Sequence, residues 1–152
     1  PLKVVNVVSS ADMCHATTEA FAQSDIAILC AAVADFTPDT AADRKIKKQP
    51  GQKGMSIGLK TTTDIAATLG TDKKAHQKLI GFALETDNEQ ANAERKLQTK
   101  NLDMIVLNSL RDKGAGFGVE TNKVTLLYAD GTKKDLPLLL KQEVADTIID
   151  SI

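Results

Sequence analysis

The chain has 152 residues, which is enough for a single domain with its own hydrophobic core. Its formal net charge is −1 and only 3% of its residues are aromatic, so it lacks both the basic surface and the stacking platforms of a nucleic-acid-binding protein. No apolar stretch reaches the length of a membrane span, and we expect neither a nucleic acid nor a membrane as a partner.

Apolar strands and helices alternate through the first half of the chain. Residues 2–8 are apolar and β-branched, which is typical of a buried strand. Ser10 is a suitable N-cap for the helix that follows, and the carboxylate of Asp64 favours the start of a second helix. The predicted elements are a strand at 2–8, a helix at 11–23, strands at 26–33 and 55–59, and a helix at 63–69.

The second half continues this alternation and ends in a hairpin. The dipeptide Asp130-Gly131 between two apolar runs predicts a type I′ turn. The predicted elements are a strand at 79–84, a helix at 88–100, a strand at 104–107, hairpin strands at 123–128 and 133–136, and a helix at 141–151. The chain, 1–152, is therefore expected to form one α/β domain, a Rossmann-like, mostly parallel sheet with helices on both faces plus a C-terminal antiparallel hairpin.

A nucleotide-binding domain of this class usually carries a glycine-rich phosphate turn after its first strand. The first predicted strand is instead followed by Val8-Ser9-Ser10-Ala11, which contains no glycine. The one glycine cluster, Gly114-Ala-Gly116-Phe-Gly118, precedes a hairpin rather than a helix, and we interpret it as a glycine-rich loop. A Rossmann-like oxidoreductase would need a dinucleotide fingerprint, which is missing here, so the sequence gives this function little support.

The two cysteines and two histidines do not form a metal-binding pattern. Cys14 and Cys30 lie inside a predicted helix and a predicted strand, and we expect both to be buried and reduced in a cytoplasmic protein. His15 and His76 are far apart in sequence and have no second ligand at a suitable spacing. These residues therefore predict no zinc site.

A carboxylate and a cluster of cations follow the second predicted strand. Small residues and then Asp35 stand where this strand ends, so a ligand could approach the backbone and bond to the carboxylate. A loop at 36–54 follows, and between Arg44 and Lys60 the chain has six Lys or Arg and no acid. We interpret the loop as mobile, with Lys45 able to close over an anion. A solvated basic loop explains the same charges.

Three further features could contact the same ligand. The helix that begins near Thr63 and Asp64 offers free backbone N–H groups. Lys96 and Lys100 are four residues apart and project from one face of a predicted helix. Phe82 could stack on a ligand or fill the core. Each feature also has an ordinary structural explanation: a helix cap, a solvated helix face, and a core residue.

Other polar residues lie near these groups in the predicted fold. Glu85 and Asn108 end two predicted strands, where the ligand-binding residues of α/β sheets collect. Glu94 lies on the same helix as the two lysines and, if that helix face is simply solvated, would offset their charge.

Taken together, these residues resemble bacterial phosphopantothenate–cysteine ligase, which is often the C-terminal half of a bifunctional coenzyme A biosynthesis flavoprotein. The resemblance covers nearly the whole chain and is carried by motifs in the same order and at similar spacing. These motifs are Ala31-Ala-Val-Ala-Asp35-Phe, Lys45-Ile-Lys-Lys48, Thr63-Asp64-Ile65, Ile80-Gly-Phe-Ala-Leu-Glu85-Thr86, Lys96-Leu97, Lys100-Asn-Leu-Asp103, Asn108 and Gly116-Phe117.

The resemblance implies CTP-dependent ligation of 4′-phosphopantothenate with L-cysteine through an acyl-cytidylate. It also implies Mg²⁺ as the cofactor, a homodimer, a cytoplasmic location and a catalytic role for Lys45. The nucleotide-binding residues that it implies are Ala31, Asp35, Lys45, Thr63, Asp64, Ile65, Ala66, Phe82, Lys96 and Lys100, and it identifies no metal ligands.

The sequence departs from this family at two places. Thr63 stands where relatives often have Pro before the Asp-Ile pair, a change that still suits a helix N-terminus. The family's opening strand, glycine-rich turn, and Asn-containing and Ser-Ser-Gly-Lys segments have no counterpart in these 152 residues. A non-catalytic nucleotide-binding or regulatory α/β domain is therefore the alternative function.

Overall fold

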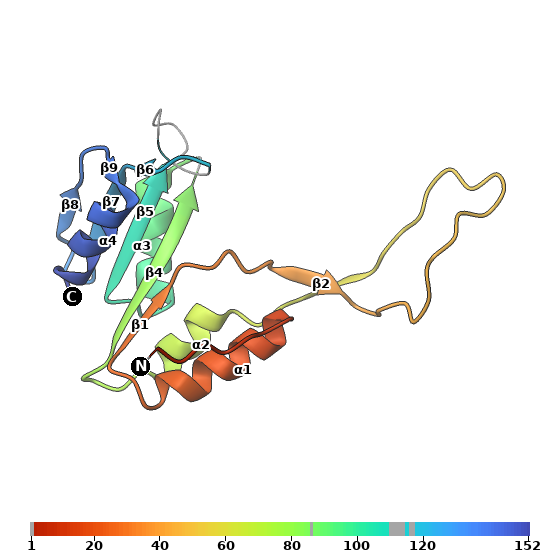
Figure 1. The fold of residues 1–152 in the computed structure, drawn as a ribbon, viewed down its shortest axis with the longest axis horizontal. Helices are drawn as coiled ribbons and strands as arrows, with labels where there is room; N and C mark the ends of the chain where they lie inside the picture. The colour runs from red at the N-terminus through yellow and green to blue at the C-terminus, as the bar shows by residue number, and fades with distance from the viewer. Residues whose placement is uncertain (1, 86, 110–114, 116–117) are drawn as a thin grey trace.

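The computed structural model describes residues 2–85, 87–109, 115 and 118–152. Its centre is a five-stranded sheet in the order β1-β4-β5-β7-β8 (Figure 1). β1, β4 and β5 are parallel, and β7 and β8 continue the sheet as antiparallel strands. The strands are β1 (Ile26–Leu29), β4 (Lys78–Glu85), β5 (Met104–Ser109), β7 (Val124–Tyr128) and β8 (Lys133–Asp135).

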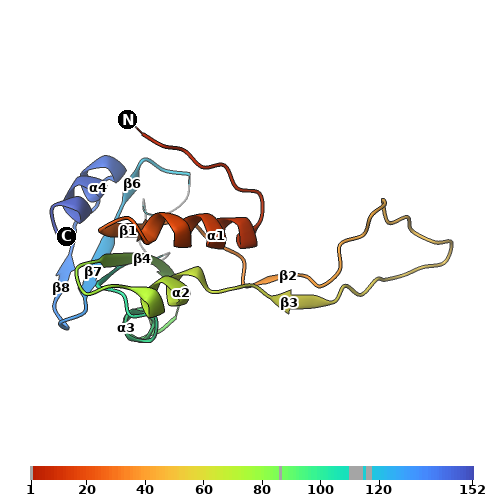
Figure 2. The same ribbon diagram turned by 90° about the horizontal axis from the view of Figure 1, so that it is seen from below.

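Helices pack on both faces of this sheet, as the sequence predicts (Figure 2). On one face, Phe21 of α1, Leu69 of α2 and Leu97 of α3 belong to one buried cluster. On the other face, Val144 and Ile148 of α4 belong to a second buried cluster. The helices are α1 (Ser10–Phe21), α2 (Ile65–Asp72), α3 (Glu89–Thr99) and α4 (Lys141–Ile149).

The central position of β4 and β5 explains their apolar sequences, because helices cover both faces of each strand except near Phe82 and Leu84 of β4, which are partly exposed. Leu79 and Ala83 of β4 join the cluster under α1, α2 and α3, whereas Ile80 joins the cluster under α4. Side chains alternate between the two faces of a strand, so Phe82 points to the same face as Ile80. Glu85 points to the opposite face, toward α3.

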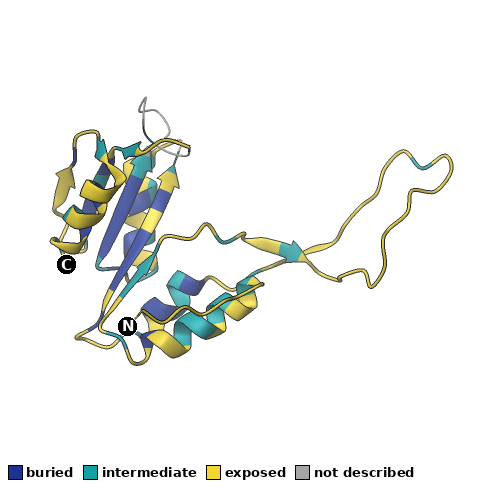
Figure 3. Ribbon diagram, in the orientation of Figure 1, coloured by how far each residue is buried: buried dark blue, intermediate teal, exposed yellow. Residues whose placement is uncertain are grey.

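A long two-stranded arm extends away from the body of the molecule (Figure 1). β2 (Phe36–Pro38) and β3 (Leu59–Thr61) pair antiparallel at its base. Residues 39–58 form the rest of the arm, and most of them are exposed (Figure 3). The basic loop predicted at 36–54 lies on this arm.

Four local expectations about strands and caps are wrong. Residues 2–8 form no strand, because no strand in the described chain pairs with them, and their apolar side chains are exposed. β1 ends at Leu29 instead of continuing to residue 33, and the strand predicted at 55–59 is instead β3. Ser9, not Ser10, caps α1: Ser9 Oγ accepts the Asp12 N–H at 3.1 Å, and the Asp12 carboxylate accepts the Ser9 N–H at 2.9 Å.

The predicted hairpin of β7 and β8 is present, but its turn is not type I′. A type I′ turn needs positive φ at both central residues, and only Gly131, at 86°, has it. The Gly131 N–H donates to the Tyr128 carbonyl, and the Tyr128 N–H donates to the Thr132 carbonyl. This pattern is typical of a three-residue turn whose glycine forms a bulge.

Some smaller features of the structure differ from the predictions or lie outside them. β6 (Thr121–Asn122) and β9 (Leu139–Leu140) form a second small sheet that the sequence did not predict. Cys30 is exposed rather than buried, because it follows the last residue of β1. Thr86 and most of the glycine cluster at 114–118 lie outside the described residues. None of the described helices combines the length and apolar character needed to cross a membrane.

Candidate functional site

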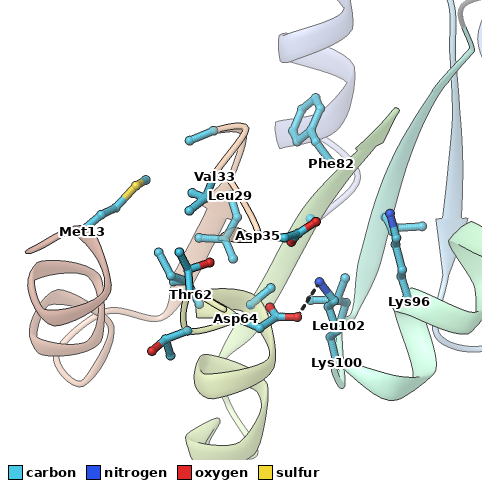
Figure 4. A pocket seen from close by; sticks show the side chains of 16 residues that line it. Met13, Leu29, Val33, Asp35, Thr62, Asp64, Phe82, Lys96, Lys100 and Leu102 are labelled. Atoms are coloured by element: carbon cyan, nitrogen blue, oxygen red, sulfur yellow. Dashed lines mark ion pairs between the residues drawn. The ribbon is translucent and has the colours of Figure 1, made fainter. Parts of the chain in front are cut away.

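A pocket of about 180 Å³ lies at the carboxyl ends of β1 and β4 (Figure 4). Small-molecule pockets usually measure about 300–1,000 Å³, so this one could enclose only part of a nucleotide. Nine of the ten nucleotide-binding residues implied by the resemblance line it. They are Ala31, Asp35, Thr63, Asp64, Ile65, Ala66, Phe82, Lys96 and Lys100.

Four segments that are distant in sequence bring these residues together. Ala31 and Asp35 follow β1, and Phe82 lies on β4. Residues 63–66 form the start of α2, and the two lysines lie on and just after α3. The pocket therefore lies where strands end and a helix begins, the usual place for anions in α/β folds.

The segment after β1 is held against the start of α2. Thr62 Oγ1 donates to the Ala34 carbonyl at 2.6 Å, and the Thr62 N–H donates to the Asp35 carbonyl at 2.9 Å. These bonds use only the backbone of Asp35. Its carboxylate makes no ion pair with any residue that the structure describes. It is therefore available to a ligand.

Lys100 forms an ion pair inside the pocket. Its Nζ lies 2.9 Å from Asp64 Oδ2 (Figure 4). Asp64 is also the N-cap of α2, since its Oδ1 accepts the Ala67 N–H at 3.0 Å. Burial raises the pKa of Asp64, but the hydrogen bonds from Lys100 and Ala67 and the charge of Lys100 outweigh it, so the pKa is lowered. A phosphate bound by Lys100 would compete with this carboxylate.

Lys96 has a different kind of partner. Its Nζ lies 2.6 Å from Glu85 Oε1, and Asn92 Nδ2 lies 3.4 Å from Glu85 Oε2. Glu94, on the same helix, accepts a hydrogen bond from Gln90, and the ion pair of Lys96 is with Glu85 instead. Glu85 is the last residue of β4, on the face of the sheet that α3 covers. The Lys96–Glu85 pair therefore forms because α3 packs on the sheet, and not because of residue spacing along the helix.

Phe82 does not fill the core, since 38% of its surface is exposed. It contributes to the pocket lining. By strand alternation its side chain lies on the α4 face of the sheet, while α3 brings both lysines to the opposite face. A ligand that touched both the ring and the lysines would therefore have to cross the carboxyl end of β4.

Lys45 is the one predicted nucleotide-binding residue that the structure places elsewhere. It lies on the arm, which extends away from the sheet and its helices (Figure 1). It is therefore not among the described residues that line the pocket.

Several lining residues were not anticipated from the sequence. Met13, Leu29, Val33 and Leu102 provide apolar walls. Their sequence signal is the same as that of ordinary core residues, and Met13, Leu29, Val33 and Leu102 also pack in the buried cluster under α1, α2 and α3. Apolar character alone could not distinguish a pocket wall from the core.

The described side chains include no group of three or more metal-ligating residues. Asn108, which the sequence places at a strand end, lies at the end of β5. Its Oδ1 atom is buried and has no hydrogen-bond partner among the residues that the structure describes.

Comparison with known proteins places the chain in a family. The model of the DNA/pantothenate metabolism flavoprotein C-terminal domain matches residues 1–152. The chain is 55% identical over 151 residues to a cysteine/cysteine sulfinic acid decarboxylase from an unknown prokaryotic organism, covering 99% of this chain and 42% of the relative. It is 48% identical over 148 residues to the coenzyme A biosynthesis bifunctional protein CoaBC of Bacillus subtilis (strain 168), covering 97% and 36%.

A solved structure agrees with this assignment. The crystal structure of the C-terminal domain of CoaBC has a TM-score of 0.76 and 39% sequence identity, and the match covers 97% of this chain and 64% of that one. The chain spans 42% of the length of the decarboxylase and 36% of the length of the Bacillus subtilis protein. Because the family model matches every residue from 1 to 152, the chain belongs to the family of the DNA/pantothenate metabolism flavoprotein C-terminal domain.

Proposed function

We propose that this chain carries the ligase site of a phosphopantothenate–cysteine ligase, which joins 4′-phosphopantothenate to L-cysteine with CTP in coenzyme A biosynthesis. The observation that carries the proposal is the pocket, which gathers Asp35, Lys96, Lys100 and the start of α2 at one end of the sheet. The family assignment and the name of the Bacillus subtilis relative support the same pathway.

The proposed reaction has two steps, and in each step a nucleophile forms one bond while the bond to a leaving group breaks. The carboxylate of 4′-phosphopantothenate attacks the α-phosphorus of CTP, and pyrophosphate leaves with the electron pair of the broken P–O bond. The amine of cysteine then attacks the acyl carbon of the acyl-cytidylate, CMP leaves, and the nitrogen releases a proton. Both steps transfer negative charge to a departing phosphate group, which nearby fixed cations stabilise.

The pocket residues fit these needs. The ammonium groups of Lys96 and Lys100 would bind the phosphates and stabilise the leaving pyrophosphate. Backbone N–H groups of Ile65 and Ala66, at the start of α2, would bind a phosphate or the edge of the base. Asp35 would accept hydrogen bonds from the ribose or another ligand donor, close to Ala31 and Phe82.

Mg²⁺ is the cofactor that we propose, and the chemistry of the pocket is compatible with it. Mg²⁺ is usually held by one or two carboxylates together with phosphates and water, and Asp35 and Asp64 both line the pocket. When bound with CTP, the ion would neutralise phosphate charge. Asp35 is the better candidate of the two carboxylates, since Asp64 is already paired with Lys100.

We further propose that the protein is a cytoplasmic homodimer and that Lys45 acts at the reacting centre. Lys45 lies on the arm, which extends away from the sheet and its helices, and it is not among the described residues that line the pocket of its own chain. The arm would therefore have to fold back, or Lys45 would have to enter the pocket of a second copy. Mixing two inactive variants, Lys45→Ala and Asp35→Asn, distinguishes these routes, because restored activity requires exchange between copies.

The proposed function is tested by titrating the purified protein with nucleotides and by measuring pyrophosphate release. We expect CTP to bind more tightly than ATP, GTP or UTP, and Lys100→Ala or Lys96→Ala to weaken CTP binding about tenfold or more. Equal affinity for all four nucleotides would contradict the proposal. Binding of CTP without pyrophosphate release in the presence of 4′-phosphopantothenate would instead favour a nucleotide-binding regulatory domain.

A further inference from the structure

We infer that Glu85 is a positioning residue for nucleotide binding: from outside the pocket it holds Lys96 in the orientation that meets the phosphates. This inference rests on the proposed function. Glu85 Oε1 lies 2.6 Å from Lys96 Nζ, while Glu85 itself does not belong to the described pocket lining.

The burial of this pair is unequal. The Glu85 side chain is 13% exposed and that of Lys96 is 39% exposed. The carboxylate is therefore enclosed between the end of β4 and α3, and the ammonium reaches toward solvent and the pocket. Withdrawing a carboxylate from water is costly unless it is paired and hydrogen-bonded. Among the described residues, Glu85 meets that condition through α3.

Two residues of α3 hold the carboxylate. Asn92 and Lys96 lie one helical turn apart, and they contact Oε2 and Oε1 of Glu85 at 3.4 and 2.6 Å. Asn92 Nδ2 also donates to the Asp87 carbonyl at 2.9 Å. The carboxylate thus has a defined orientation before any ligand arrives.

This arrangement leaves Lys96 free to bind a phosphate. A lysine ammonium has three N–H donors, so one can stay on Glu85 while the others bind a ligand. An unpaired lysine loses side-chain conformational entropy when it binds a ligand. Because the ion pair with Glu85 already restricts the side chain of Lys96, less entropy is lost on binding.

The second lysine of the pocket is held differently, which makes it an internal reference. Lys100 is paired with Asp64, a residue that lines the pocket and competes directly with an incoming phosphate. Loss of Glu85 should therefore change what Lys96 contributes to binding and leave the contribution of Lys100 unchanged.

The first test is Glu85→Gln, measured by isothermal titration with CTP and Mg²⁺. We expect the Kd to rise about tenfold, by analogy with the loss of affinity when the hydrogen-bond partner of a metal ligand is removed. Charge alone predicts the opposite, since removing a negative group near an anion site strengthens binding. An unchanged or lower Kd would overturn the inference.

Glu94→Gln is the matched control. It makes the same chemical change on α3, where Glu94 accepts a hydrogen bond from Gln90 and does not contact Lys96 in the structure. We expect its Kd for CTP to stay within about twofold of the original. A rise equal to that of Glu85→Gln would show that the effect does not depend on the contact with Lys96, and it would overturn the inference.

A double-mutant cycle separates positioning from a structural effect. Lys96→Met should weaken CTP binding strongly in the original protein and only slightly in the Glu85→Gln variant, whereas Lys100→Met should weaken it equally in both. Additive effects at Lys96, in a protein that binds CTP, overturn this inference alone. Absence of CTP binding in the unaltered protein overturns the proposed function and this inference with it.

A second variant covers the case in which Glu85→Gln does not fold. Asn92→Ala removes the weaker contact to Glu85 and leaves both charges in place. We expect a rise in Kd of about threefold, the equivalent of one ordinary hydrogen bond. A folded Asn92→Ala variant with unchanged affinity would contradict the inference.

Discussion

Asp103 joins three segments of the chain at the end of the sheet opposite the pocket. Its carboxylate accepts the Leu79 N–H at 2.9 Å and a hydrogen bond from Lys73 Nζ at 2.7 Å, and Lys78 Nζ lies 3.4 Å away. One side chain therefore connects the start of β4, the residue after α2 and the start of β5. Its loss would leave a backbone donor and a lysine without their partner.

We expect Asp103→Ala to lower the free energy of unfolding by about 2 kcal/mol, because it removes a partner from partly buried donors. Urea denaturation measures this change. Asp146→Ala is the control: Asp146 is exposed and accepts a hydrogen bond from Gln142 on α4, so its loss should change stability by less than about 0.5 kcal/mol. Equal effects of the two variants would contradict the role given to Asp103.

The same carboxylate predicts a dependence of stability on pH. Burial raises the pKa of Asp103, but the hydrogen bonds from Lys73 and Leu79 and the charges of Lys73 and Lys78 outweigh it, so the pKa lies below its ordinary value of 3.8. A lowered folded-state pKa gives stability that is fully present above the unfolded value and is lost as the pH falls through the folded value.

We therefore expect the stability difference between the original protein and Asp103→Asn to be largest near neutral pH and to shrink below about pH 4. Urea denaturation at a series of pH values measures this difference. A gap that stays constant down to pH 2 would show that the charge of Asp103 does not stabilise the fold.

Single residues were predicted well from the sequence when their role depended on where a strand or helix ends. Asp64 and Glu85 lie at such ends, as expected, whereas Asp35 lies between β1, which ends at Leu29, and β2. Which carboxylate pairs with which lysine was not predictable, because the partners are up to 36 positions apart, as for Lys100 and Asp64. Only the folded chain brings them within hydrogen-bond distance.

At the scale of elements, α2 and α3 meet at Gly70. A Cβ atom at this position would lie 1.9 Å from the Lys100 carbonyl oxygen and 2.8 Å from its carbon, both backbone atoms. Asn101 Nδ2 also donates to the Gly70 carbonyl at 2.7 Å. The absent side chain therefore allows the end of α3, and with it Lys100, to approach the pocket.

We expect Gly70→Ala to destabilise the protein by about 2 kcal/mol, since the backbone of residue 100 must move. In an open helix the same change would stabilise by about 1 kcal/mol, so the sign of the effect is diagnostic. Thermal unfolding measures it, and nucleotide titration should show weaker binding through the displaced Lys100. Gly54→Ala, with no atom within 4 Å of the added Cβ, should be nearly neutral.

The positions of the helices follow from local features of the sequence, whereas a strand also depends on a partner that can be distant in sequence. Periodicity and capping residues predicted the four helices of the described residues to within a few positions. The strand expected at 2–8 did not form, because a strand needs a neighbour for its backbone hydrogen bonds and none of the described strands pairs with it. β-Branched composition indicates a preference for extended structure but does not supply that neighbour.

At the scale of the whole molecule, the arm has one apolar and one polar face. Phe36 pairs with Thr61 and Pro38 with Leu59, so Phe36 and Leu59 share a face, while Thr37 and Lys60 lie on the other. Phe36 and Leu59 are each 58% exposed. A two-stranded ribbon is at best marginally stable by itself in water, and the apolar face is the part of the arm best suited to contact a second copy.

We therefore expect Phe36→Glu combined with Leu59→Glu to convert the proposed homodimer into a monomer, because charges would be buried in the contact. Light scattering after size-exclusion chromatography measures the mass. Thr37→Glu, on the polar face of the same ribbon, is the control and should leave the mass unchanged. A monomeric mass for the unaltered protein, or a dimer that survives both substitutions, would contradict the proposal.

The sequence by itself determined the alternation of strands and helices and the two-sided sheet with its hairpin, because periodicity and turn residues are local properties of a chain. Its resemblance to a family implied nine of the residues that line the pocket. The tertiary structure alone decided that Glu85 pairs with Lys96, that Phe82 lies on the face opposite the lysines, and that Lys45 lies on an arm extending away from the sheet and its helices. These outcomes depend on distances between elements far apart in sequence, which strand order and helix packing set.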